Sequence, residues 1–454
     1  MNETADLTAE ELTAIRGDFP ALEKVGRGGR PIVYLDSGAT SQKPAVVIDA
    51  ESEFYRDFNG AVHRNTHLLG DEATVHFEDA RETLADFIGA EVDEIVWTKN
   101  ATEALNLVAS AFSNASAGIG ADGARATGDT TLGDLSGRFR LEGGDRIVVT
   151  RAEHHSNLVP WQQVAEKTGA TLSWLDLTPD GRIDLESLHV IDANTKVVAF
   201  THASNVTGAI SPVTEIVEAA RKVGAITVLD TCQSSAHMPV DVRELGVDFA
   251  VFSSHKMLGP TGIGALWGRF ELLEAMPPVL TGGSVVADVT MSETKYLPPP
   301  AKFEAGSQPV AQAVAWGVAL RYLSEIGMEK IARHEAEMTE LLLERISEIE
   351  GIRVLGPTDN TDRLGVVAFD VEGVHPHDVG QVLDFEDVAV RVGHHCAIPL
   401  HRFFGVKASS RATIALTTTG EEIDQFITGL KKVREYFGLA ETQKPTMIGN
   451  GEVQ

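Results

Sequence analysis

Short apolar runs rich in β-branched residues recur through the first part of the chain, and helical stretches follow several of them. The runs cover residues 94–98, 146–150, 197–201, 226–230, 249–253 and 264–268, and the helical candidates cover 101–112, 158–168 and 212–223. Strands that alternate with helices predict an α/β fold, with a largely parallel sheet covered on both faces. Such folds bind their ligands at the carboxyl ends of the strands. Polar residues that directly follow these runs are therefore the first candidates for a functional site.

The rest of the chain predicts a second, smaller α+β domain. A long helical stretch over 311–349 leads into it, followed by strands at 365–371, 388–392 and 412–416 and helices near 375–383 and 421–436. The chain then divides into an N-terminal segment 1–30 that packs with the small domain, a large domain 31–310, a small domain 311–440 and a flexible tail 441–454. Residues 114–144 are rich in Gly, Ala, Asp and Thr and predict a surface insertion in the large domain.

Composition narrows the class of protein. The chain has 454 residues, of which 43% are hydrophobic, and this supports a sizeable core in more than one domain. A net charge of -28 argues against a nucleic-acid surface. Its spread-out acidic residues are typical of salt-loving organisms, although an ordinary acidic enzyme is the alternative. Two cysteines predict a reducing cytoplasm. The acidic N-terminus and the lack of a long apolar run predict neither a signal peptide nor a membrane span.

The sharpest local feature is a lysine at the end of an apolar run. Residues 249–256 read FAVFSSHK, and a Gly-rich turn follows up to Gly264. Burial disfavours the charged form of a lysine, so the pKa of Lys256 is expected to be lowered. A neutral amine of this kind can form a Schiff base with an aldehyde. A solvated lysine at a strand end is the alternative, and for a lysine without further context it is the more common one.

Three other stretches favour the chemical interpretation of Lys256. Asp230 ends the run ITVLD, where a carboxylate can keep a pyridine nitrogen protonated. Residues 100–106 follow a strand and open a helix, so their free N–H groups and the Thr102 hydroxyl suit a phosphate, although an ordinary helix cap explains them equally well. Residues 153–157 (EHHSN) supply a flat ring that could stack on a cofactor. Paired histidines are more often structural or metal-binding, but adjacent histidines chelate one metal ion poorly.

Taken together, these stretches resemble the class V aminotransferase group, and specifically the SufS-type cysteine desulfurases. The resemblance spans about residues 22–439. It is carried by YLDSGATSQKP (34–44), VHR (62–64), ATEA (101–104), EHH (153–155), THASNV (201–206), Asp230 with Gln233, residues 253–264, FEAG (303–306) and RVGHHCAIPL (391–400). The resemblance implies fold type I of the enzymes that depend on pyridoxal phosphate: a large domain with a mostly parallel seven-stranded sheet and a smaller α+β C-terminal domain. The last stretch separates this subgroup from other class V enzymes.

The resemblance also implies roles for individual residues. Lys256 holds pyridoxal phosphate through a Schiff base, Asp230 pairs with the pyridine nitrogen, Gln233 bonds the ring hydroxyl and His154 stacks on the ring. The phosphate is held by Ala101, Thr102, Ser253 and His255, with Ser307 reaching the phosphate of the other subunit of a homodimer. The carboxylate of the substrate is bound by Asn205 and Arg411 with Arg391 beside them, and His63 belongs to the same substrate-binding set. An Arg fork suits a carboxylate because it donates two parallel hydrogen bonds.

By the same resemblance, Cys396 receives the sulfur of L-cysteine. Lys256 removes the α-proton of the bound substrate, the Cys396 thiolate attacks the substrate sulfur, and a persulfide on Cys396 and free alanine result. His394, His395 and Arg391 supply polar or positive neighbours. A single cysteine is usually a small buried hydrophobe, but the polar His-His-Cys context favours catalysis. Cys232 follows Asp230 on a buried strand end, and a structural role is expected for it.

The implied function is sulfur mobilisation in the cytoplasm for iron–sulfur cluster assembly, with an acceptor protein or cluster scaffold as partner. Alternatives that keep the cofactor are an aminotransferase, a selenocysteine lyase and a kynureninase-like hydrolase; a non-catalytic scaffold of the same fold is another. Cys396 argues against transamination, and the presence of Lys256, Asp230 and Cys396 argues against a scaffold. One departure from the family pattern is the pair Asn100-Ala101, which stands where Gly-Thr is common and removes one hydroxyl from the expected phosphate site.

Overall fold

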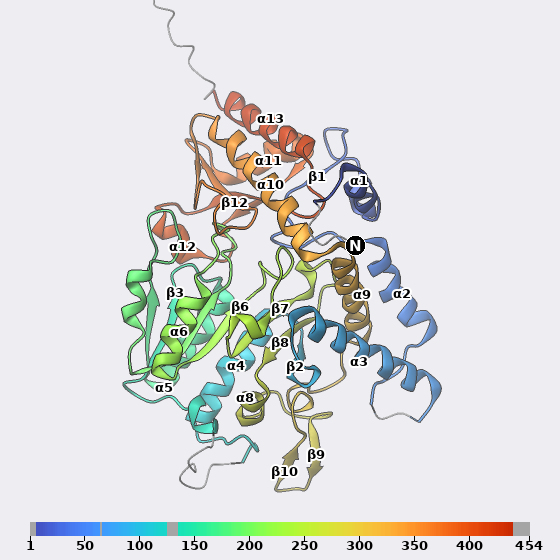
Figure 1. The fold of residues 1–454 in the computed structure, drawn as a ribbon, viewed down its shortest axis with the longest axis vertical. Helices are drawn as coiled ribbons and strands as arrows, with labels where there is room; N and C mark the ends of the chain where they lie inside the picture. Colours follow the sequence, from blue (N-terminus) through green and yellow to red (C-terminus); the bar gives the residue numbers. More distant parts are fainter. Residues whose placement is uncertain (1–5, 64–65, 125–134, 439–454) are drawn as a thin grey trace, which may run out of the picture.

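The computed structural model describes residues 6–63, 66–124 and 135–438, which form a large domain with a small domain above it in the view of Figure 1. The large domain is built on a seven-stranded sheet. Its spatial order is β2 (Ile95–Thr98), β8 (Gly264–Gly268), β7 (Phe249–Ser253), β6 (Ile226–Asp230), β5 (Thr195–Thr201), β3 (Arg146–Thr150) and β4 (Thr171–Leu175). Strand β8 runs antiparallel to both of its neighbours, and the other strands of this sheet are parallel. The predicted mostly parallel, seven-stranded sheet is confirmed.

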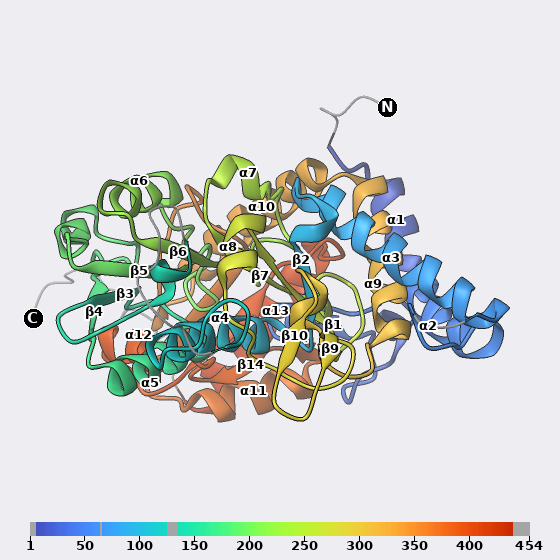
Figure 2. The ribbon, with the colours of Figure 1, turned by 90° about the horizontal axis from the view of Figure 1, so that it is seen from below.

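Both faces of the sheet are buried at its central strands, which are mostly apolar. In β5, Val197 and Ala199 belong to one core cluster, while Val198 and Phe200 belong to the other. This follows from the alternation of side chains along a strand. One face is covered by α4 (Ala101–Ser116) and α5 (Val159–Thr168), and the other by α3 (Leu68–Ile88), α6 (Val213–Val223) and α9 (Val310–Ile326). Figure 2 shows α5 and α6 on opposite sides of the strands.

The small domain has its own sheet and its own core. The strand order is β11 (Ile352–Val354), β12 (Val366–Val371), β15 (Ser409–Thr413) and β14 (Arg391–Gly393), all antiparallel. Helices α10 (Met328–Ser347), α11 (Pro376–Phe385) and α13 (Gly420–Tyr436) cover it, and the short α12 (Ile398–Phe403) lies at the junction with the large domain in Figure 1. The remaining elements are α1 (Ala9–Gly17), α2 (Ala45–Asp57), α7 (Val242–Leu245), α8 (Phe270–Ala275), the hairpin β9 (Val286–Val289) and β10 (Thr294–Tyr296), and β1 (Val33–Tyr34), which pairs with β13 (Val388–Ala389).

The N-terminal segment lies against the small domain. Arg16 of α1 forms an ion pair with Glu422 of α13 at 2.8 Å. Two backbone N–H groups, those of Gly28 and Arg30, donate to the buried carboxylate of Asp387, which ends the turn between α11 and β13. The chain then enters β1 and passes to α2 of the large domain.

The structure corrects several boundaries that the sequence predicted. The stretch 311–349 is two helices, α9 and α10, separated by Gly327, whose φ of +96° lies outside the helical region. Helix α9 packs on α2 and α3, so by packing it belongs to the large domain although the predicted boundary placed it in the small one. Strand β15 begins at Ser409 instead of residue 412, because its polar first residues are buried. The predicted strand 388–392 is divided between β13 and β14.

Strand β4 was missed by the sequence analysis, and the predicted insertion is described in part. Trp174 of β4 is 50% exposed at the edge of the sheet, so the apolar pattern of that strand is weak. Within 114–144, α4 continues to Ser116, and Phe139 is buried in the core cluster under α4. Residues 125–134 and the tail from residue 439 lie outside the described part of the chain. No helix among the described residues is long and apolar enough to cross a membrane.

Candidate active site

A cavity of about 210 Å³ opens where the carboxyl ends of the central strands meet the small domain. It is lined by nearly all the residues that the sequence singled out: Ala101, Thr102, His154, Asn205, Asp230, Gln233, Ser253, His255, Lys256, Arg391, Cys396 and Arg411. The strand ends of β5, β6 and β7 meet there because parallel strands finish at the same edge of a sheet. The small domain adds the two arginines and the cysteine. His63 and Ser307 are the two predicted site residues that do not line this cavity.

Lys256 follows β7 directly and lies at the wall of the cavity. Burial lowers the pKa of Lys256, and the positive charges of Arg411 and Arg391 act in the same direction. Asp230 acts in the opposite direction, because a nearby carboxylate favours the ammonium form. A lowered pKa increases the fraction of neutral amine, the form that reacts with aldehydes and accepts protons.

The side chains around Lys256 fit a pyridine ring with a hydroxyl substituent. The carboxylate of Asp230 is buried at the end of β6, where one oxygen accepts from the backbone N–H of Cys232 at 3.0 Å. Gln233 donates from Nε2 to the carbonyl oxygen of Gly38 at 3.0 Å, and its buried Oε1 has no hydrogen-bond partner among the described residues. A buried acceptor without a donor is costly, so a ligand hydroxyl is the natural partner for it.

His154 has the properties of a stacking ring. Burial lowers the pKa of His154 to about 4, which keeps the imidazole neutral at physiological pH. Its Nδ1 accepts a hydrogen bond from the backbone N–H of Ser156 at 3.1 Å, which fixes the ring orientation. A neutral, fixed, flat ring at the edge of the cavity suits contact with the face of an aromatic cofactor.

A phosphate cradle lies at the start of α4. Asn100 caps this helix by accepting from the N–H of Glu103 at 3.0 Å, and the N–H of Ala101 donates to Ser253 Oγ at 2.9 Å. The hydroxyl of Thr102 lies 2.7 Å from the hydroxyl of Ser156. Gly264 permits this approach, because a Cβ at that position would lie 2.6 Å from the Cα of Asn100. Helix N-termini with hydroxyl groups around them bind anions readily.

Two arginines lie side by side on neighbouring strands of the small-domain sheet. Arg391 on β14 is the direct cross-strand partner of Arg411 on β15. Burial lowers the pKa of Arg411 to about 10, so its guanidinium stays charged at neutral pH. It donates to the carbonyl of Asn205 at 2.9 Å and lies 3.4 Å from Asp36 Oδ1, while its Nε has no partner within the described chain. Two guanidinium groups against one carboxylate leave a positive charge, which suits a carboxylate substrate.

Cys396 occupies a tight turn between β14 and α12. The N–H of Ala397 donates to the carbonyl of His394 at 2.8 Å and closes the turn. His395 and Cys396 both have positive φ values, +48° and +57°. The thiol is half-buried and lines the same cavity as Lys256. Burial lowers the pKa of His395 to about 2, so His395 is a neutral neighbour, and the positive charge beside the turn comes from the two arginines.

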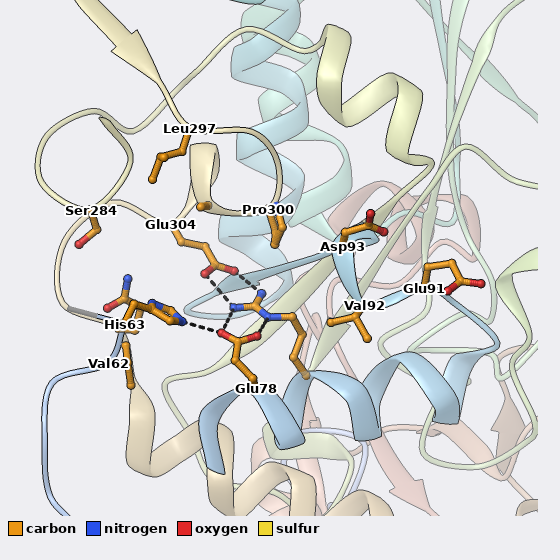
Figure 3. Close-up of a pocket in the computed structure, with 13 residues that line it drawn as sticks. Val62, His63, Glu78, Glu91, Val92, Asp93, Ser284, Leu297, Pro300 and Glu304 are labelled. Atoms are coloured by element: carbon orange, nitrogen blue, oxygen red, sulfur yellow. Dashed lines mark hydrogen bonds and ion pairs between the residues drawn. The ribbon is translucent and has the colours of Figure 1, made fainter. Parts of the chain in front are cut away.

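His63 and Ser307 lie on a different face of the chain. His63 lines a second cavity, of about 670 Å³, and its Nε2 lies 2.7 Å from Glu78. Figure 3 shows His63, Glu78 and Glu304 close together at this cavity. Arg81 forms ion pairs with both carboxylates, at 2.9 Å from Glu78 and 2.6 Å from Glu304. Ser307 belongs to the loop that follows Glu304, and the next residue along the chain lines this second cavity. Arg64, part of the VHR stretch, lies outside the described residues.

Some residues of the site were missed by the sequence analysis. Cys232 lines the Lys256 cavity, although a structural role was expected for it; burial, with the Asp230 carboxylate, raises the pKa of the Cys232 thiol and keeps it protonated. Its position two residues after the end of β6 was the available signal. His155 contacts the carbonyl of Cys396 and the N–H of Ile398, and Asp36 pairs with Arg411. Both residues lie in stretches that carried the resemblance, YLDSGATSQKP and EHH, but no role was assigned to either of them.

Comparison with known proteins places the chain in a family. The model of the family described as aminotransferase class-V matches residues 33–122 and 132–426. A probable cysteine desulfurase 2 of Mycobacterium leprae is 52% identical over 96% of this chain and 99% of its own length, and a cysteine desulfurase of Haloferax volcanii is 40% identical over 94% and 98%. The solved structure of a cysteine desulfurase from Thermococcus onnurineus NA1 has a TM-score of 0.84 and 35% identity over 95% of this chain and 99% of that one. The chain therefore belongs to the class-V aminotransferase family, and within that family it groups with the cysteine desulfurases.

Proposed function

We propose that this protein is a cysteine desulfurase dependent on pyridoxal phosphate, which takes sulfur from L-cysteine and stores it as a persulfide on Cys396. The observation that carries the proposal is that Cys396, Lys256 and the arginine pair line one small cavity. A nucleophilic thiol, a base and a carboxylate site are the three groups that this reaction requires. An aminotransferase would have no use for the cysteine.

The cavity has a group for each part of the cofactor. Lys256 would hold the aldehyde, Asp230 the ring nitrogen, Gln233 the ring hydroxyl, and the start of α4 with Ser253 the phosphate. Pyridoxal phosphate bound in this way supplies a ring that withdraws electrons from an attached amino acid and makes its α-proton acidic. The protein holds that ring and excludes water from it.

The chain's own residues then divide the reaction between them. Arg391 and Arg411 bind the substrate carboxylate and so orient its Cα–H bond. Lys256 Nζ accepts the α-proton in its neutral form. The Cys396 thiolate attacks the substrate sulfur: a sulfur–sulfur bond forms and the carbon–sulfur bond breaks. The electron pair of the broken bond stays on the β-carbon, which takes a proton and becomes the methyl group of alanine. The proton held by Lys256 returns to the α-carbon. A thiol reductant then releases the stored sulfur as sulfide.

The test of this function is a product analysis. Purified protein loaded with pyridoxal phosphate should convert L-cysteine to alanine and sulfide in equal amounts when a thiol reductant is present. Without reductant it should stop after about one alanine per subunit, because Cys396 holds the sulfur and is consumed. Formation of a 2-oxo acid from L-cysteine instead of alanine would contradict the proposal.

We further infer a homodimer in which each subunit completes the site of the other. Two observations support it. His63 and Ser307 lie away from the Lys256 cavity of their own chain, on the side of the second cavity. Helices α2 and α3, on either side of His63 in the sequence, also expose large apolar side chains: Tyr55 is 57% exposed, Leu68 70% and Val75 66%. Exposed apolar residues on adjacent helices are typical of a surface that is covered by a partner.

Complementation between two inactive variants tests the shared site. Lys256→Ala removes the lysine of its own site, and Ser307→Asp places a negative charge beside the phosphate of the partner's site. Co-expression of the two variants should restore roughly a quarter of wild-type activity, because half of the random dimers carry one intact site. Each variant alone should be inactive. Restoration to less than a few per cent, with heterodimers present by mass measurement, would contradict the shared site.

The destination of the sulfur is inferred from the resemblance. The SufS-type assignment implies delivery to an acceptor protein or cluster scaffold for iron–sulfur cluster assembly in the cytoplasm. The net charge of -28 supports adaptation to high salt, as does similarity to relatives from Haloferax volcanii and Halobacterium salinarum, although the relative from Mycobacterium leprae has the higher identity. The acceptor, the compartment and the salt adaptation stay predictions.

A further inference from the structure

The turn that carries Cys396 is attached to the large domain by two residues, His155 and Asn205, in the loops that follow the neighbouring strands β3 and β5. The backbone N–H of His155 donates to the carbonyl of Cys396 at 2.7 Å, and the ring Nε2 of His155 accepts from the N–H of Ile398 at 3.1 Å. From the end of β5, the amide Nδ2 of Asn205 donates to the carbonyl of His395 at 2.6 Å. His155 therefore contacts both peptide groups of Ala397, the residue that follows the nucleophile.

The conformation of this turn explains why it needs to be held from outside. His395 and Cys396 are consecutive L-residues at φ +48° and +57°, in the left-handed region that residues other than glycine rarely adopt. One hydrogen bond, from Ala397 N–H to the carbonyl of His394, closes the turn from within. Such strained backbone persists when its surroundings fix it, and it is concentrated at functional sites.

The hydrogen bonds of His155 also define what its ring can do. Nε2 accepts from a backbone N–H, so the proton of the neutral ring is on Nδ1. Burial lowers the pKa of His155, and the neighbouring ring of His394, 5.8 Å away between centroids, acts in the same direction. The neutral form, which alone can accept at Nε2, is therefore favoured. With Nε2 occupied by Ile398, this nitrogen is not available for proton transfer to the substrate.

We propose that His155 is the positioning residue for the nucleophile. Its Nε2 fixes the first turn of α12, and its backbone N–H fixes the Cys396 carbonyl, so that together they hold the thiol at the Lys256 cavity. This inference rests on the proposed function, because it takes Cys396 as the sulfur-accepting group. Lys256 and His155 follow strands β7 and β3 of the same sheet, so the large domain sets the distance between base and nucleophile through these contacts.

Two substitutions at His155 separate positioning from general structure. His155→Gln keeps an acceptor at nearly the place of Nε2, while His155→Leu keeps the volume and removes the acceptor. In single turnovers on L-cysteine, we expect His155→Leu to form the Cys396 persulfide about 10- to 100-fold more slowly, since small misplacements of reacting groups cost rates of this order. The KM for L-cysteine and the visible spectrum of the bound cofactor should stay those of the wild type. His155→Gln should react within about threefold of the wild-type rate.

The rate of alkylation with iodoacetamide measures independently how exposed the Cys396 thiol is. The measurement is simple because the chain has two cysteines and the other one, Cys232, is buried. In His155→Leu, Cys396 should be alkylated several-fold faster while its persulfide forms more slowly, and Cys232 should stay unlabelled.

Three results would overturn the proposal. The first is a His155→Leu protein that forms persulfide at the wild-type rate. The second is a His155→Gln protein as slow as His155→Leu. The third is labelling of Cys232 with loss of the cofactor spectrum in His155→Leu, which would indicate general unfolding. A wild-type protein that never forms a Cys396 persulfide would instead refute the proposed function itself.

Discussion

Replacing Cys396 with alanine is expected to lower alanine formation from L-cysteine by at least about 1,000-fold, because the variant has no thiolate to accept the sulfur. Without a nucleophile at that position, the carbon–sulfur bond would have to break with sulfide as a poor leaving group. The second cysteine cannot take over, since burial and the Asp230 carboxylate raise the pKa of the Cys232 thiol. The rate is measured from alanine production in the presence of a thiol reductant.

Two controls apply to this variant: the spectrum of its bound cofactor and its activity on selenocysteine. Cys396 is half-buried in the cavity wall and belongs to the small domain, whereas the predicted phosphate cradle belongs to the large domain, so Cys396→Ala should bind the cofactor with an unchanged visible spectrum. Selenium leaves more easily than sulfur, so activity on selenocysteine should fall much less. Full activity of Cys396→Ala on L-cysteine would contradict the mechanism.

Replacing Lys256 with alanine is expected to abolish turnover, with a fall of about 1,000-fold or more, because one side chain provides both the attachment of the cofactor and the base. The lowered pKa of Lys256 supports both roles, since each requires the neutral amine. Reduction of the wild-type protein with borohydride should fix the cofactor covalently to the peptide that contains Lys256. The variant should yield no such peptide.

Lys256→Arg is the matched control for charge. It retains a cation at the end of β7, so it preserves the electrostatic neighbourhood of Asp230 and Arg411, but a guanidinium forms no Schiff base under these conditions. Both variants should be equally inactive. Wild-type turnover by Lys256→Arg, or covalent cofactor at another lysine, would show that the base and the attachment point had been assigned wrongly.

The architecture of the large domain was predictable because the central strands are buried on both faces. Strands β6, β7 and β8 are mostly apolar and buried at every position, and the predicted boundaries of all three match the structure. Prediction failed where the burial of a residue does not follow its hydrophobicity. Strand β4 places Trp174 half in solvent at a sheet edge, and β15 buries the polar residues Ser409 to Arg411 because they serve the site. A periodicity argument misjudges both kinds of strand.

The large-domain part of the candidate site was also predictable from the sequence. Lys256, Asp230 and the start of α4 follow predicted strands, so the parallel sheet alone brings them to one edge. Cys396 and the arginine pair come from another domain, and only the family resemblance pointed to them. His155 was noted as part of the EHH stretch, but its role was not predicted, because both of its contacts with the turn involve backbone groups more than 200 residues away in the sequence. The sequence alone does not indicate which backbone groups a side chain will contact at that distance along the chain.

The most direct test of the account is to locate the sulfur in the wild-type protein after reaction with one equivalent of L-cysteine, without reductant. The thiols are then blocked, the protein is digested, and the masses of the two cysteine-containing peptides are measured by mass spectrometry. The account predicts that the peptide with Cys396 gains the mass of one sulfur atom and that the peptide with Cys232 gains none. Alanine formation with the extra sulfur on Cys232, or with no sulfur on either cysteine, would contradict it.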